Sequence, residues 1–204
     1  MGNCEDENAA GVKGESNTTV NQGPGDDTAV IICNIFCFYG DTIVKVLENK
    51  KLKEKHISEI KKGELVQTYN GKELIFTKVK ENIKNKGLFT FYEIKCKNEN
   101  LDTKSISITW NHKMIIYNKS KKEIKLKCAN EVKIGDIFRT KYGFFEVFEI
   151  NKKIMNDCYE LAAENGTVLA NDIFVTTVYL NRNHSNKNCQ KIIDSAKIPI
   201  DILN

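Results

Sequence analysis

Residues 57–68 read ISEIKKGELVQT, and residues 129–140 read ANEVKIGDIFRT. Each stretch predicts a short helical turn, a glycine that permits a positive φ, an acidic residue and then a strand. Tyr92-Glu93-Ile94 and Tyr159-Glu160-Leu161 follow the two copies at similar distances. Two related halves predict a compact β domain with internal pseudo-twofold symmetry, since two copies are too few for a solenoid. The alternative interpretation is a chance match between two turn-and-strand units.

The chain around this repeat consists of short β-branched and aromatic runs, separated by turn signals such as Asn70-Gly71 and Asn165-Gly166. No long helical period interrupts the series, so the expected fold class is all-β. The predicted strands are 29–39, 43–47, 65–69, 74–79, 89–95, 105–108, 113–117, 137–139, 144–150, 157–162, 167–170 and 173–179.

The composition divides the chain into three segments. Residues 1–27 are rich in Gly, Asn, Asp and Glu and hold almost no large apolar side chain, so we expect a disordered leader. Residues 28–180 carry all the predicted strands and form the expected domain. Residues 181–204 form a polar tail, too short for a second domain, in which a loose apolar period allows one short helix.

The charges exclude some function classes. The chain has 31 Lys and Arg against 27 Asp and Glu, for a net charge of +4, and both signs are interleaved. This pattern favours a solvated surface over a nucleic-acid-binding face.

The 7 cysteines include no Cys-x-x-Cys pair, so we expect no metal site and no cofactor. We also expect a monomer.

The leader lacks the basic start and the apolar run of a secretory signal, and no apolar stretch approaches the ~20 residues that span a bilayer. The expected location is therefore intracellular and cytoplasmic. Gly2 and Cys4 resemble the start of a lipidated protein, although Asp6 stands where that motif requires Ser or Thr. A plain flexible tail is the favoured interpretation.

The candidate chemistry centres on Cys37, which ends the first predicted strand. A thiol there is either a small buried hydrophobe or a nucleophile. Thr109-Trp110-Asn111-His112 ends another predicted strand, and a cysteine with a histidine is the usual pair for acyl chemistry. His56 and His184 lie in Lys-rich and polar stretches, which leaves His112 as the histidine with a shaped environment. A purely structural histidine is the alternative.

Residues 36–180 resemble the Hint domain shared by hedgehog C-terminal regions, inteins and bacterial intein-like domains. Residues 37–42 (CFYGDT) are similar to the block that opens such domains with the nucleophile, and residues 107–112 (SITWNH) to the block with a Thr-x-x-His motif. Residues 171–179 (NDIFVTTVY) resemble the closing strand, and the two repeat copies resemble the paired structural segments. The resemblance implies a horseshoe-like, pseudo-twofold β domain.

The resemblance also implies self-cleavage of the chain. The Cys37 thiol would attack the carbonyl of Phe36 and turn the Phe36–Cys37 amide into a thioester. His112 would be the general acid for the departing nitrogen of Cys37. Thr109 would hold the scissile peptide through its hydroxyl. The substrate would be the chain's own N-terminal segment, and the chemistry requires no metal or cofactor.

Two departures from the family pattern narrow the expected reaction. Splicing inteins end in His-Asn, whereas this chain has Thr176-Thr177, which cannot form a succinimide, so splicing is not expected. Hedgehog domains use an aspartate base to activate sterol. Here Lys84 stands near that point, with Glu81 as the nearest acid, and the sterol-binding extension is reduced to a short tail. We therefore expect water or another nucleophile, rather than sterol, to resolve the thioester.

Two other functions stay open at this point. A degenerate Hint domain would keep the fold but act as an interaction or structural module, and Phe36 before the nucleophile and the missing acid favour it. A Lys-rich β domain that binds nucleic acid would show salt-sensitive binding and no self-cleavage.

Overall fold

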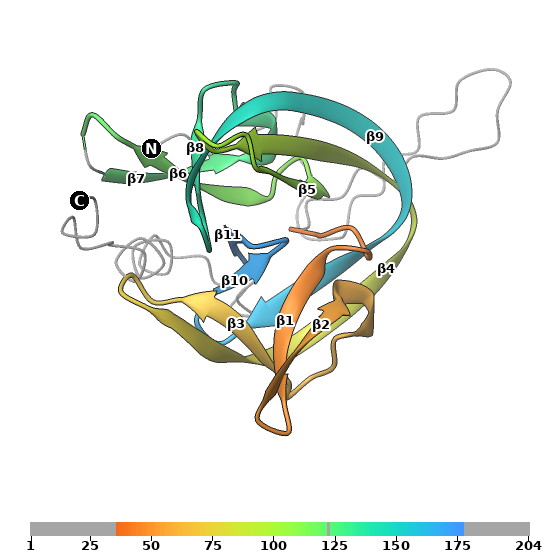
Figure 1. Ribbon diagram of the computed structural model, residues 1–204. Coiled ribbons are helices and arrows are strands. Elements are labelled where there is room, and N and C mark those ends of the chain that lie inside the picture. Colours follow the sequence, from red (N-terminus) through yellow and green to blue (C-terminus); the bar gives the residue numbers. More distant parts are fainter. Residues whose placement is uncertain (1–35, 122, 178–204) are drawn as a thin grey trace, which may run out of the picture.

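The computed structural model describes residues 36–121 and 123–177, and most of these residues lie in β-strands (Figure 1). Within these ranges there is no α-helix, and no helix is long and apolar enough to cross a membrane. Two single turns of 3-10 helix are η1 (Ile57–Glu59) and η2 (Ala129–Glu131). The strands are β1 (Ile43–Glu48), β2 (Lys51–His56), β3 (Leu65–Tyr69), β4 (Leu74–Lys97), β5 (Thr103–Thr109), β6 (Lys113–Asn118), β7 (Glu123–Cys128), β8 (Ile137–Thr140), β9 (Gly143–Ala163), β10 (Thr167–Ala170) and β11 (Ile173–Thr176).

These strands form a single sheet that curls back on itself. Its order is β10-β1-β3-β4-β9-β8-β11-β6-β7, with β2 beside β1 and β5 beside β4, and a further pairing of β10 with β11 closes the path. The long strands β4 and β9 pair antiparallel over most of their length. In Figure 1 they form a broad arc that joins the β1–β3 end of the molecule to the β6–β8 end. The all-β prediction is confirmed.

The repeat seen in the sequence is a structural repeat. Gly63 and Gly135 have φ values of 92° and 91°, a conformation that side chains with a Cβ rarely adopt. The Gly63 N–H donates to Val79 O on β4 at 2.8 Å, and the Gly135 N–H donates to Val147 O on β9 at 2.9 Å. Each glycine therefore turns the chain from a 3-10 turn into the strand that follows.

The acidic residue after each glycine also has the same task in both copies. Oε2 of Glu64 accepts a hydrogen bond from Lys61 N, and Oδ2 of Asp136 accepts one from Lys133 N, both at 2.9 Å. Each carboxylate caps the N–H groups of its own turn, which otherwise lack partners. The two halves are thus related in backbone conformation and in hydrogen bonding.

The main hydrophobic core draws on nearly every strand. Strand β1 shows the alternation that buries one face of a sheet, because Val44 and Val46 are buried and the residues between and beside them are not. The largest fully buried side chains are Phe38, Phe91, Phe138, Phe145, Phe174, Ile57, Ile94, Ile106, Ile108, Met114, Ile115 and Leu161. Burial of each contributes about 1.5–3 kcal/mol relative to exposure.

The strand boundaries differ from prediction in two ways. The predicted strands 74–79 and 89–95 are parts of β4, and 144–150 and 157–162 are parts of β9, because the polar residues between them stay paired across the two strands. Strands β2 and β7 were not predicted. Their alternating charges resemble a loop, but each is an outer strand that pairs with one neighbour and has a solvated side.

Several predictions fall partly or wholly outside the described residues. The leader 1–27 and the tail 181–204 lie outside them, as do the domain boundaries at 28 and 180. Of the predicted strand 29–39 only Phe36 to Tyr39 are described. They form an isolated β-bridge at Phe38 rather than a strand.

Candidate functional site

Cys37 and the Thr-x-x-His motif meet on the pseudo-twofold axis. Phe38 forms a β-bridge with Ile108, and the backbone bonds around that bridge are reciprocal. The Tyr39 N–H donates to Ser107 O and the Thr109 N–H donates to Cys37 O, both at 3.0 Å. The sequence prediction that these two segments, far apart in the chain, lie together agrees with this geometry.

The two segments end in the same kind of turn. The Thr42 N–H donates to Tyr39 O at 3.1 Å, and the His112 N–H donates to Thr109 O at 3.0 Å. Each turn is then tied to the 3-10 turn of its own half, because Thr42 O accepts from Ile57 N at 2.7 Å and His112 O accepts from Ala129 N at 2.9 Å. The repeat therefore supplies both the nucleophile turn and the histidine turn.

Gly40 allows the nucleophile turn to lie close to β9. A Cβ on Gly40 would come within 2.9 Å of the Tyr159 ring, which is shorter than real contacts of that kind. Tyr159 in turn exchanges two backbone hydrogen bonds of 2.9 Å with Phe38. A side chain at position 40 would therefore displace the segment that carries Cys37.

Thr109 binds the amide nitrogen of Cys37, which is the leaving group of the predicted cleavage. The Cys37 N–H donates to Thr109 Oγ1 at 3.0 Å, and both residues are buried. The same hydroxyl donates to Oδ1 of Asn111 at 3.3 Å. Asn111 thus fixes the direction of the hydroxyl proton and leaves an oxygen lone pair for the Cys37 N–H.

His112 is fully buried, and its Nε2 lies 2.9 Å from the carbonyl oxygen of Thr176. A carbonyl accepts only, so Nε2 carries the proton in the neutral ring. Burial lowers the pKa of His112 to about 4, although contacts with the backbone of Thr176 and Cys37 favour the protonated form. Nδ1 makes no hydrogen bond of good geometry with any described residue. The resting imidazole is therefore neutral, with its lone pair on Nδ1.

Aromatic rings hold the imidazole in place. The ring of Phe38 meets that of His112 edge-on at 4.5 Å between centroids, and the ring of Phe36 does so at 6.3 Å. Phe36 and Phe38 flank Cys37, so the histidine lies against both neighbours of the candidate nucleophile. Phe36, which precedes the predicted cleavage point, and Phe38, which follows the predicted nucleophile, therefore both lie against the His112 ring.

The Cys37 side chain lies in a small apolar cluster with Phe89, Phe91 and Cys158. The Asn85 Nδ2 lies 3.9 Å from its sulfur. Sequence reasoning missed Asn85. Its position on β4 puts it opposite Cys158 of β9, and only this strand pairing brings it to the thiol.

The residue beside it, Lys84, has a different environment. Its Nζ lies 2.7 Å from Oδ2 of Asp157, which raises the pKa of Lys84, and 5.8 Å from the centroid of the Tyr159 ring. Glu81 pairs with Ala162 at another point of β9. The sequence pointed to Lys84 as the residue near the position of the aspartate base of hedgehog domains. In the structure the neighbouring amide of Asn85 is the group that lies next to the Cys37 sulfur.

Both threonines of the closing strand use their side chains on the backbone. Thr176 Oγ1 donates to Lys113 O at 2.6 Å, and Thr177 Oγ1 accepts from Ala163 N at 3.2 Å. The contribution of Thr176 to the site is its carbonyl, which fixes the tautomer of His112. The sequence pointed to this strand but not to that role, because a backbone carbonyl has no sequence signal.

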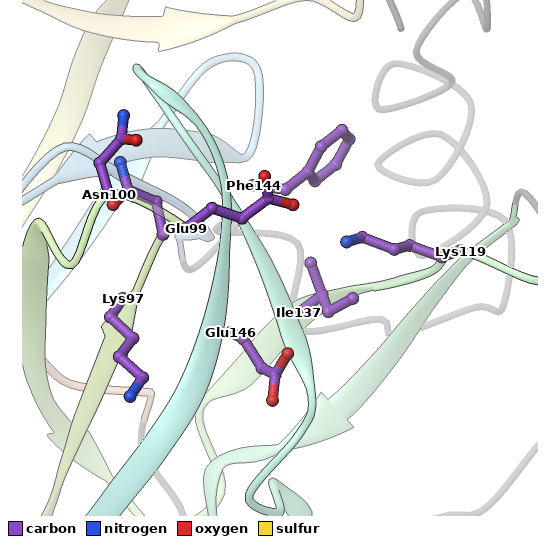
Figure 2. A pocket seen from close by; sticks show the side chains of 8 residues that line it. Lys97, Glu99, Asn100, Lys119, Ile137, Phe144 and Glu146 are labelled. Atoms are coloured by element: carbon purple, nitrogen blue, oxygen red, sulfur yellow. The ribbon is translucent and has the colours of Figure 1, made fainter.

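The described residues include no group of three or more His, Cys, Asp or Glu side chains able to hold a metal ion. A cavity of about 490 Å³ lies at the opposite end of β5 from Thr109. Figure 2 shows its mixed lining, with Lys97 and Lys119 against Glu99 and Glu146. This cavity is separate from the cluster around Cys37.

No protein-family model matches the sequence, and no curated protein matches it significantly. Solved structures do match. The gp41-1 intein aligns over 70% of this chain and 98% of its own length, with a TM-score of 0.54 and 19% identity. A DnaB intein from Synechocystis sp. PCC 6803 aligns over 70% and 99%, with a TM-score of 0.55 and 18% identity. The bacterial intein-like domain from Clostridium thermocellum aligns over 69% and 98%, with a TM-score of 0.53 and 17% identity.

The chain has the Hint fold. The comparisons confirm the resemblance drawn from the sequence at the level of the fold, and they cover nearly the whole length of the matched structures. Within the Hint fold of this chain, the first described residues and the last described strand meet at His112, through Phe36 and Thr176.

Proposed function

We propose that this Hint domain cleaves its own chain between Phe36 and Cys37 in a single turnover. The observation that carries the proposal is the 3.0 Å hydrogen bond from the Cys37 N–H to Thr109 Oγ1, beside a buried neutral His112. This arrangement binds the nitrogen that must leave and supplies a nearby group that can carry a proton.

The first step is the transfer of the acyl group from nitrogen to sulfur. The Cys37 sulfur attacks the carbonyl carbon of Phe36, and the thiol proton passes to Nδ1 of His112 as the bond forms. The Asn85 amide, 3.9 Å from the sulfur, stabilises the negative charge there. A C–S bond forms and the carbonyl oxygen becomes an oxyanion.

The second step breaks the C–N bond. An imidazolium with a pKa of about 4 gives up its proton more readily than an ordinary one, so His112 returns its proton to the departing nitrogen of Cys37. The product is a thioester at Phe36 and a free amine on Cys37. Water then attacks the thioester, which gives a carboxylate at Phe36 and regenerates the thiol.

The reaction ends without splicing. Thr176 and Thr177 occupy the end of the closing strand, and both side chains are hydrogen-bonded to the backbone. Neither carries an amide that could cyclise and release the C-terminal flank. The proposal includes an unknown nucleophile in place of water. A sterol is not favoured as that nucleophile, because the group at Asn85 is an amide and not a carboxylate that could activate a sterol hydroxyl.

The test is the mass of the purified full-length chain after incubation with dithiothreitol or with hydroxylamine. We expect two fragments. One begins at Cys37, and the other ends at Phe36 and carries a free acid, a thiol adduct or a hydroxamate there. Cys37→Ala removes the nucleophile and should abolish cleavage, and Cys96→Ala serves as a matched control, because Cys96 is buried elsewhere in the sheet.

A wild-type chain that stays intact under both nucleophiles would overturn the proposal. The fold would then serve as a non-cleaving interaction module, the second function considered from the sequence. Cleavage that persists in Cys37→Ala would also exclude the thioester route.

A further inference from the structure

A cluster of charged residues lies around the turn between β10 and β11, away from Cys37. Asn171 and Asp172 form this turn with φ values of 49° and 63°, which directs the Asp172 carboxylate toward two neighbouring strands. Its Oδ2 lies 2.7 Å from Nζ of Lys104 on β5, and its Oδ1 lies 3.6 Å from Nζ of Lys45 on β1. A third lysine, Lys141, donates its backbone N–H to Asp172 O at 2.8 Å.

An aromatic ring lies beside these lysines. Tyr142, in the turn between β8 and β9, is 57% exposed. Nζ of Lys104 lies 5.0 Å from the centroid of this ring, and Nζ of Lys141 lies 5.6 Å from it. We call Lys45, Lys104, Lys141, Asp172 and Tyr142 the Asp172 cluster. It draws on four separate segments of the chain.

Positive charge exceeds negative charge in the Asp172 cluster. Three ammonium groups surround one carboxylate, and the only other acid near Lys45 among the described residues is Glu54, at 3.6 Å, whose side chain is 62% exposed. Lys45 and Lys141 each influence the protonation of the other. Neighbouring ammonium groups repel each other, and the one carboxylate, which Lys104 already binds, does not balance the charge of both.

The protonation of the two lysines reflects this crowding. Burial, and then the neighbouring Lys45, lower the pKa of Lys141. Burial also acts on Lys45, but its interaction with Lys141 and the charge of Asp172 raise the pKa of Lys45. An oxyanion between the two amines would accept hydrogen bonds from both and remove their repulsion.

We propose that the Asp172 cluster binds a phosphate group. Lys45, Lys104 and Lys141 bring ammonium donors from three segments of the chain, which suits an anion with several acceptor oxygens. Tyr142 is 57% exposed, so part of its ring is open to contact a flat ring attached to that phosphate. The ligand is therefore either free phosphate or a small aromatic phosphate such as a nucleoside monophosphate. Asp172 precedes β11 and Thr176 ends it, so this site is distinct from the one at Cys37.

The experiment is a titration of the ¹⁵N-labelled Cys37→Ala full-length chain with inorganic phosphate and, separately, with adenosine monophosphate, up to about 10 mM at constant ionic strength. We expect saturable amide shifts confined to the Asp172 cluster and its turn. Lys141→Met should weaken binding about tenfold, because one charge-assisted bond is lost. Lys141→Arg keeps the charge and should restore most of the affinity.

Lys62→Met is the matched control, since it removes the same charge from an exposed turn before β3 and should change the affinity less than about twofold. Tighter binding of the monophosphate, lost in Tyr142→Ala, identifies an aromatic phosphate; equal binding of both ligands identifies free phosphate. Absence of saturable shifts with either ligand overturns the proposal. An equal loss of affinity in Lys62→Met and Lys141→Met does so as well, because it would mean non-specific attraction.

Discussion

Thr109 connects the amide of the proposed cleavage to the second half of the site, since its hydroxyl accepts from the Cys37 N–H and donates to Asn111. A hydroxyl with both partners occupied holds the peptide nitrogen in one orientation. The nitrogen must become pyramidal as it leaves, and an acceptor on its N–H favours the geometry in which its lone pair turns toward a proton donor. In the proposed cleavage, Thr109 therefore has a positioning role for the nitrogen that His112 would protonate.

Removal of this hydroxyl gives the first prediction. Thr109→Val keeps the shape of the side chain and loses the bond to the Cys37 N–H, so thioester formation should slow about 100-fold. The measurement is the rate of dithiothreitol-induced cleavage, followed by mass. Thr140→Val, at a buried threonine of β8, is the control and should cleave at the wild-type rate. Similar rates for Thr109→Val and the wild type would exclude the role.

The buried imidazole gives the second prediction. The pKa of His112 is about 4 in the folded chain against 6.5 when unfolded, so the unfolded state binds more protons between these values. Stability should fall as pH decreases through this window. Between about pH 7 and about pH 4.5 the loss from His112 alone should be about 2–3 kcal/mol.

Urea unfolding of the wild type and of His112→Gln at the two pH values measures this loss. Gln can still donate to Thr176 O but does not titrate, so the carboxylates common to both proteins cancel in the comparison. The wild type should lose more stability than the variant. Equal losses would mean that His112 has an ordinary pKa in the folded chain.

The residues of the site differ in how far sequence could reveal them. Cys37, Thr109 and His112 stand in short recognisable motifs, and the structure brings their segments together. Asn85 has no such motif, because its contact with the sulfur depends on the register between β4 and β9. The carbonyl of Thr176 is a main-chain atom that any residue would provide.

Among the elements, η1 and η2 with the glycines after them were predictable, since the rule that they obey is local. A φ near 90°, as Gly63 and Gly135 have it, favours glycine, and both copies have glycine there. The lengths of β4 and β9 were not predictable in this way. Their polar middle sections resemble loops, and only pairing with each other keeps them extended.

The equivalence of the two turns gives a third prediction. Gly63→Ala and Gly135→Ala should each destabilise the fold by about 1–2 kcal/mol, because an L residue is strained at these φ values. Steric clash adds little, since the nearest atom to a Cβ is Lys78 Cε at 4.0 Å in the first case and nothing lies within 4 Å in the second. Urea denaturation measures both. A large difference between the two variants would contradict the equivalence.

On the scale of the whole molecule, one sheet contains all the described strands, and its halves share the core around Phe38. Such a structure should unfold as a single unit. Trp110 is the single tryptophan of the chain. It lies in the turn between Thr109 and His112, so its fluorescence reports on the site. Far-ultraviolet circular dichroism reports on the sheet.

The fourth prediction is that the two signals give coincident urea transitions. Phe138→Ala, in the core of the second half, should shift both midpoints equally while costing about 3–5 kcal/mol. A fluorescence transition that precedes the loss of circular dichroism would mean that the site opens separately from the sheet.

The reciprocal hydrogen bonds at the axis also bear on the ancestry of the chain. They make Ser107 the counterpart of Cys37, and Thr42 the counterpart of His112. Duplication and fusion of a half-length gene would produce this pairing, starting from a homodimer with one identical half-site in each subunit. In the present chain the first half has Cys37 and Thr42 at these positions, and the second half has Ser107 and His112. Each half thus contributes one of the two groups that the proposed cleavage needs, the thiol from the first half and the imidazole from the second.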